Sequence, residues 1–146
     1  MKKFFYLLVC LFVSMACFTS CSSDDDDNDG GDPSTPKATV TIQETSNQLI
    51  MTSVWKDVLT QTMTATFGSN NILTTCILEE SYSNKKYADE AWASLEGDKT
   101  IDMSKFSRNG NVIIEDMTED FAGLNKAQVK SIFEATKAQN EKGGVK

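Results

Sequence analysis

The sequence contains no histidine, the residue that most often serves as a general base or binds a transition metal. Without an imidazole, neither a Ser-His-Asp nor a Cys-His catalytic arrangement can form. The chain also lacks a glycine-rich loop of the kind that holds phosphate groups. These absences exclude the commonest hydrolytic and nucleotide-dependent sites.

Cysteine is scarce in the later part of the chain. Cys10, Cys17 and Cys21 lie in the first 21 residues, and Cys76 is the only cysteine that follows. A single cysteine cannot form an internal disulfide, even in an oxidising compartment. Because Cys76 lies in an apolar segment with no histidine to activate it, we expect an inert core residue.

The N-terminus has the layout of an export signal. Met1-Lys2-Lys3 is basic, and the 13 residues from Phe4 to Ala16 contain almost no polar group. A helix of that length is too short to cross a hydrocarbon core of about 30 Å. We therefore predict that residues 1–20 are a signal peptide, removed from the mature protein.

The residues around Cys21 resemble the acylation site of a bacterial lipoprotein. Thr19 and Ser20 are small residues before the cysteine, although Phe18 stands where a branched aliphatic residue is usual. The resemblance implies that Cys21 becomes acylated and anchors the chain to a membrane through lipid. Cys17 is a second candidate, but the polar residues that follow Cys21 favour the later site. An ordinary signal peptide is the alternative.

An acidic segment follows Cys21 directly. It consists of Ser22, Ser23, Asp24, Asp25, Asp26 and Asp27. The segment is similar to the export tag of Bacteroidetes-type, surface-exposed lipoproteins. This resemblance implies an outer-membrane location facing the cell exterior. The alternative is a solvated spacer on a lipoprotein that faces the periplasm.

Residues 21–36 are predicted to be a disordered tether, because Asp, Gly, Ser and Pro dominate them and no large apolar side chain is present. After removal of residues 1–20, 12 basic and 21 acidic residues give a net charge of −9. Six of the acids lie in the tether, so residues 37–146 carry a net charge of only −3. With no basic patch to neutralise phosphates, we expect no nucleic-acid partner.

Residues 37–146 are predicted to form a single α+β domain with an antiparallel sheet of five to six strands and two helices packed on one face. Threonines alternate with apolar residues along 59–67, so one face of the sheet should meet water and the other a core. The predicted strands are 38–42, 48–55, 59–67, 72–80, 102–108 and 111–117.

Two helices are predicted after hairpins. The first helix is expected to be capped by Ser83 and to end at Gly97, with Trp92 in its core-facing stripe. Asn125 is expected to cap the second, with Gln128 completing a capping box. Because each helix follows a hairpin, we predict a ββα unit used twice, with extra strands in front.

Carboxylates offer the remaining chemistry. Glu79-Glu80 and Glu115-Asp116 are sequence neighbours, so strand alternation points the members of each pair to opposite faces and disfavours a glycosidase site. Residues 115–120 offer oxygen ligands to Ca²⁺ but lack the glycine and distal glutamate of a calcium loop. We expect no enzyme activity, no metal and no cofactor.

The sequence thus favours a non-catalytic binding module at the cell surface, with an unidentified protein or glycan partner. Contact would use the open sheet face or exposed aromatics, for which the candidates are Trp55, Tyr82 and Tyr87. The alternative is a periplasm-facing envelope module or a protease- or enzyme-inhibitor-like module, since the layout loosely resembles the PepSY and β-lactamase-inhibitor-like class of small α+β lipoproteins. Aromatic side chains on the sheet face that carries the threonines would favour the surface binding module. A wedge-like loop, or a concave sheet without aromatics, would favour the periplasmic or inhibitor-like module.

Overall fold

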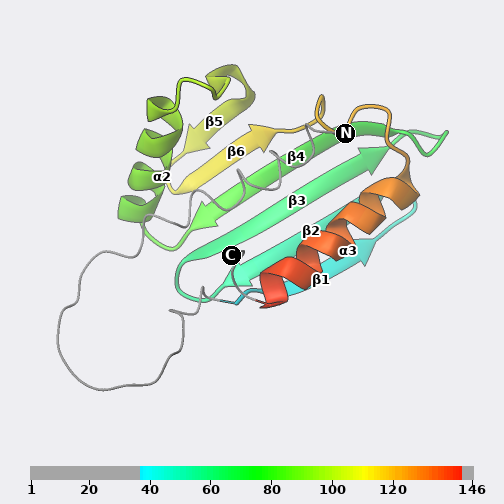
Figure 1. The fold of residues 1–146 in the computed structure, drawn as a ribbon, viewed down its shortest axis with the longest axis horizontal. Helices are drawn as coiled ribbons and strands as arrows, with labels where there is room; N and C mark the ends of the chain where they lie inside the picture. The colour runs from blue at the N-terminus through cyan, green and yellow to red at the C-terminus, as the bar shows by residue number, and fades with distance from the viewer. Residues whose placement is uncertain (1–36, 143–146) are drawn as a thin grey trace.

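The computed structural model describes residues 37–142, which form one antiparallel sheet and two helices (Figure 1). The strand order is β1-β2-β3-β4-β6-β5. The strands are β1 (Thr39–Glu44), β2 (Gln48–Trp55), β3 (Leu59–Phe67), β4 (Leu73–Tyr82), β5 (Phe106–Asn109) and β6 (Val112–Asp116). The helices are α2 (Lys85–Gly97) and α3 (Lys126–Lys142), with a 3-10 turn, η2, at Met103–Lys105. The predicted α+β class and sheet are confirmed.

The strands β1 to β4 form a continuous meander. The bounds predicted for β2 and β3 are correct at both ends. In β3, threonines alternate with apolar side chains, with Gln61 the one exception, whereas β2 is rich in branched and large apolar residues. The turns between these strands use left-handed backbone at Asp57 (φ 62°) and Asn71 (φ 60°). Both are residue types that tolerate this conformation.

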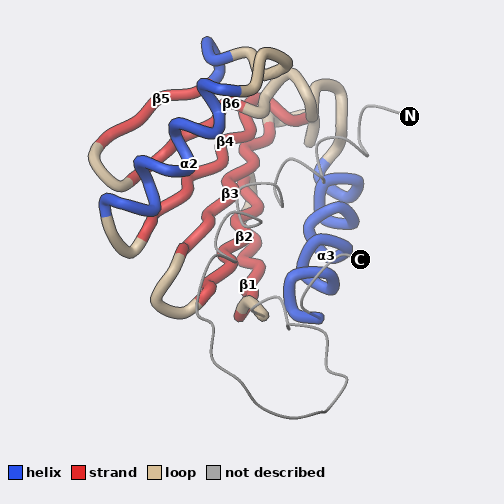
Figure 2. The backbone as a smooth tube through the Cα atoms, turned by 60° about the vertical axis from the view of Figure 1, so that its left-hand side comes forward, coloured by secondary structure: helices blue, strands red, loops and turns tan. Residues whose placement is uncertain are grey.

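Both helices cover the same face of the sheet, at opposite ends of it (Figures 1 and 2). The helix α2 packs over β4 and β6, whereas α3 packs over β1 and β2. The core between helices and sheet includes Met63, Leu78, Ile113 and Phe133, all buried. The opposite sheet face has no helix over it among the described residues.

The N-cap of α2 differs from the prediction by one residue. The side chain of Asn84, rather than Ser83, accepts a hydrogen bond from the backbone N–H of Tyr87 at 3.0 Å. The Ser83 hydroxyl instead donates to the carbonyl of Asp57 in the β2–β3 turn. The prediction of Ser83 is therefore wrong by one position: both residue types can cap a helix, and the Ser83 hydroxyl is engaged by Asp57.

The capping box of α3 is confirmed. The N–H of Gln128 donates to the Asn125 side chain, and the Gln128 side chain accepts from the N–H of Asn125, both at 3.0 Å. The partly buried Trp92 packs against the core from α2 and donates from Nε1 to Glu96 at 2.8 Å.

The second hairpin is shorter than predicted. Residues 103–105 form η2, because Asp102 accepts hydrogen bonds from Ser104 and turns the chain before β5 begins. The turn lies at Gly110, whose φ of +59° is accessible to glycine at little cost. The duplicated ββα unit is not confirmed: α2 packs on the strand before it, but α3 packs on β1 and β2, away from the β5–β6 hairpin.

Candidate functional site

The predicted anchor lies outside the described residues 37–142. This applies to the acylation site, Cys21, and to the acidic segment from Ser22 to Asp27. Within residues 37–142, neither helix has the length and apolar character needed to span a bilayer.

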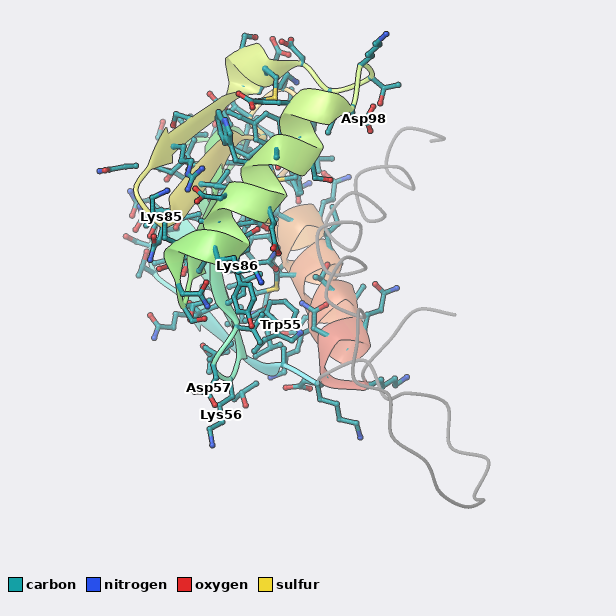
Figure 3. The ribbon with its side chains drawn as sticks, turned by 90° about the vertical axis from the view of Figure 1, so that its left-hand side faces the viewer. Trp55, Lys56, Asp57, Lys85, Lys86 and Asp98 are labelled. Carbon is teal, nitrogen blue, oxygen red and sulfur yellow. The ribbon has the colours of Figure 1, made fainter. Side chains whose placement is uncertain are left out.

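The three candidate contact aromatics do not form an exposed cluster. Trp55 is 5% exposed and Tyr82 is 4% exposed, so both are core residues and the prediction of surface contact is wrong for them. The reason is register, because both pair with Leu59 on the face that the helices cover. Figure 3 shows Trp55 directed inward, while Lys56 and Asp57 of the next turn point away from the fold. Tyr87 is half-buried against the core.

The uncovered sheet face carries threonines in register across the strands. Thr41, Thr52 and Thr62 are direct cross-strand neighbours at its centre. We call this surface the threonine face. It consists of Thr39, Thr41, Gln43, Gln48, Ile50, Thr52, Val54, Thr60, Thr62, Thr64, Thr66, Thr75, Ile77, Glu79, Ser81, Ser107, Asn109, Val112, Ile114 and Asp116.

The threonine face is almost uncharged. Glu79 and Asp116 are the only ionisable members of the set defined above, and none of its members is aromatic or basic. Aliphatic side chains lie among the hydroxyls, and Val54 is 40% exposed. Each threonine offers a hydroxyl that donates and accepts together with an apolar methyl group. The face can therefore bind through hydrogen bonds and apolar contact.

The covered face carries a buried polar cluster at the middle of the sheet. Glu80 is 9% exposed, and its two carboxylate oxygens accept hydrogen bonds from Gln61 at 2.6 Å and from the Tyr82 hydroxyl at 2.9 Å. In the same sheet row, Ser53 accepts a hydrogen bond from Asn140 of α3 at 3.2 Å. Among residues 37–142, every buried polar side-chain atom has a partner. The cluster thus joins β2, β3, β4 and α3.

Burial changes the protonation of the acids on the covered face. It raises the pKa of Glu80 against the opposing effect of its two hydrogen-bond donors. Burial also raises the pKa of Glu115 to about 7, with a further contribution from the negative charge of Glu80. The pKa of Tyr82 is raised by burial and by the neighbouring Glu80. Both glutamates therefore favour the protonated form more than exposed carboxyls do.

Sequence reasoning separated the members of each acidic pair correctly but missed that Glu80 and Glu115 share a face. Their proximity follows from the pairing of Leu78 with Glu115 across β4 and β6. No local pattern encodes this register, since 29 residues, 83–111, separate the two strands. The sequence offered one sign of the buried polar cluster, which is Gln61, the single polar residue on the apolar side of β3.

A small cavity adjoins the cluster between α3 and the sheet. Its volume is about 10 Å³, and Ser53, Gln61, Thr136 and Asn140 provide its polar lining. That space is comparable to one water molecule. Organic ligands usually occupy pockets of roughly 300–1,000 Å³. The cavity thus fits a structural water and is too small for an organic substrate.

The acidic residues considered for calcium are engaged with the protein itself. Asp116 accepts hydrogen bonds from Thr118, while Lys105 forms ion pairs with Glu119 and Asp120 at 3.1 and 3.6 Å. Across the described part of the chain, no group of three or more His, Cys, Asp or Glu side chains is arranged to hold a metal ion.

Comparison of the chain with models of protein families, with curated proteins and with solved structures finds no match.

Proposed function

We propose that this protein is a lipid-anchored outer-membrane lipoprotein whose domain is a non-catalytic binding module at the cell surface. The anchor is Cys21, and the acidic segment from Ser22 to Asp27 directs the domain to the cell exterior. The threonine face is the contact surface. The observation that carries the proposal concerns the sheet of residues 37–142: two of its helices pack on one face, and no helix of that range covers the other face, which is nearly free of charge.

The chemistry of the threonine face favours a protein partner over a glycan. Glycan sites usually stack sugars on aromatic rings, and the threonine face has none. The cores of protein–protein interfaces are depleted in charged side chains, as this face is. Its rows of hydroxyl and methyl groups suit a partner that offers backbone amides and aliphatic side chains.

The alternative function is a periplasm-facing envelope module or a protease- or enzyme-inhibitor-like module. It is favoured by one observation, the lack of aromatic side chains on the threonine face. Both functions require a protein contact, and they differ in where the domain faces.

Protease accessibility on intact cells separates the two locations. The native chain is compared with a variant in which Asp24 to Asp27 are changed to alanine. We expect cleavage of the domain in the native chain and protection in the variant. Protection of both forms on intact cells, with cleavage only after the outer membrane is opened, would support the periplasmic alternative.

Photo-crosslinking tests the contact surface itself. A photoreactive residue replaces Thr62 at the centre of the threonine face, and in a matched control it replaces Ser94, which is exposed on α2. We expect a discrete protein adduct from position 62 that position 94 does not give. Identical adducts from both positions, or none from position 62, would contradict the use of this face.

A further inference from the structure

The strand β1 is an open edge of the sheet. Among the described residues it pairs only with β2. The N–H of Thr45 donates to the carbonyl of Gln48, its direct partner, at 3.0 Å. Hydrogen-bonded pairs alternate along an antiparallel ladder, so Thr41 also bonds to β2, and the backbone groups of the residues between point outward.

Three residues of β1 therefore present backbone donors and acceptors that have no partner among residues 37–142: Val40, Ile42 and Glu44. The same alternation predicts an outward N–H at Ala38, and this group donates to the carbonyl of Asn140 at 3.0 Å. That bond confirms which residues of β1 direct their backbone groups away from β2. The C-terminal part of α3 thus closes one end of the edge and leaves the rest open.

Within residues 37–142, the edge lacks several of the features that normally prevent sheet-to-sheet pairing. Natural edge strands carry proline, a bulge or charged side chains, lysine above all, are very short, or are covered by a helix or loop. The sequence of β1, Thr-Val-Thr-Ile-Gln-Glu, has no proline or lysine, and its pairing with β2 is regular. By contrast, the other edge strand, β5, has four residues and includes Arg108, which is ion-paired with Asp89 of α2.

We propose that β1 pairs antiparallel with β1 of a second copy of this chain, which joins the two sheets into one. The register is centred on Ile42, with Val40 opposite Glu44 of the second copy. This register keeps the covered faces on the same side, and it engages the outward backbone groups of all three residues. It also places Thr41 opposite Gln43 of the second copy on the threonine face, which then continues across both copies.

The helices support the same arrangement. Lys130 forms an ion pair with Glu44 at 2.8 Å, so this side of α3 faces the β1 edge. Glu134 lies four residues later on the same side of the helix. Because the two copies of α3 run antiparallel, Lys130 of one copy meets Glu134 of the other. The helix α3 lies over β1 and β2 (Figure 1), one strand spacing of about 4.8 Å from the axis between the two copies of β1. The axes of the two helices are therefore about 10 Å apart, which is an ordinary packing distance.

The register is tested by cysteine pairing in the full chain, purified in a non-ionic detergent. Cys76 is buried, so Thr41→Cys or Gln43→Cys adds the only exposed thiol of residues 37–142. Under mild oxidation we expect a disulfide-linked dimer when the two variants are mixed and none from either alone. A dimer from Thr41→Cys alone, or none from the mixture, would overturn the proposed pairing.

The oligomeric state provides a second measurement that is independent of disulfide chemistry. Sedimentation of the native full chain in the same detergent should give the mass of two copies. Ile42→Pro removes an outward N–H without removing a bond to β2, so we expect a monomer with unchanged circular dichroism. A native chain that stays monomeric at every concentration, or an Ile42→Pro variant that remains folded and dimeric, would overturn the proposal.

Discussion

Glu80 is a carboxylate in the core whose hydrogen-bond partners within residues 37–142 are neutral donors. Gln61 and the Tyr82 hydroxyl each serve one oxygen, but neither supplies a positive charge. Removing an ionised carboxylate from water costs several kcal/mol unless a cation compensates. Glu115 adds a second acid on the same face. The folded state therefore gains when these groups take up protons.

This gain predicts an unusual dependence of stability on pH. The pKa of Glu115 is about 7 in the folded state and 4.5 in an exposed side chain, so the folded chain binds this proton more tightly than the unfolded chain. The contribution is fully present below pH 4.5 and is lost as pH rises through 7. We expect the free energy of unfolding to fall by about 2 kcal/mol between pH 5 and pH 8.

Urea unfolding at pH 5, 6, 7 and 8 measures this dependence. Glu115→Gln should reduce the slope, because the amide does not titrate, while Glu80, whose pKa is also raised, still contributes. Glu79→Gln, on the exposed threonine face, is the control and should retain the slope. A native chain that is equally stable at pH 5 and pH 8, or more stable at pH 8, would refute the role of these buried acids.

The two tryptophans should differ in their contribution to stability, although sequence pattern assigned the core role to Trp92 and surface contact to Trp55. Trp55 is 5% exposed, whereas Trp92 is only partly buried at the margin of the core. Trp55→Ala should therefore cost about 3–5 kcal/mol, the usual range for a buried aromatic. Trp92→Ala should cost less. Thermal and urea unfolding of the two variants shows which substitution costs more stability. A larger loss of stability from Trp92→Ala would mean that Trp92, and not Trp55, is the core tryptophan.

At the scale of elements, the first turn of α2 depends on Asn84. Its side chain accepts a hydrogen bond from the N–H of Tyr87, one of the N–H groups at the start of the helix. Asn84→Ala should reduce the free energy of unfolding by about 1 kcal/mol, a typical cost for a lost N-cap. Ser83→Ala is the matched neighbour and should cost less, because it removes only an exposed hydrogen bond to the Asp57 carbonyl. Equal losses, or a larger loss from Ser83→Ala, would show that Asn84 is not the cap.

The elements show which parts of the fold local sequence can predict. The strands β2 and β3 were predicted to the residue, because the alternation within β3 and the branched and large apolar residues of β2 are both local features. The capping box at Asn125 and Gln128 is equally local. The destination of α3 was not predictable, since ion pairs from Lys126 and Lys130 to Glu44 join residues more than 80 positions apart. The proximity of Glu80 and Glu115 was not predicted for the same reason, because it depends on the register of β4 against β6.

For the molecule as a whole, the two sides of the sheet have opposite roles. Every second residue of β3 faces the helices and is buried, while Thr60, Thr62, Thr64 and Thr66 face the other way and are half-buried. Stability therefore resides on one side of the sheet, and the other side is free to vary without loss of the fold. A binding surface placed there can change its partner while the core stays the same.

Two neighbouring residues of β3 test this division directly. Thr62→Lys places a charge on the threonine face beside Glu79, its cross-strand partner, so the free energy of unfolding should change by no more than about 0.5 kcal/mol. Met63→Lys places the same charge in the core, where Met63 is 3% exposed, and should cost at least about 3 kcal/mol. Urea unfolding of both variants at pH 7 gives the comparison. Strong destabilisation by Thr62→Lys would mean that the threonine face is covered in the folded protein, and the contact surface would have to be sought elsewhere.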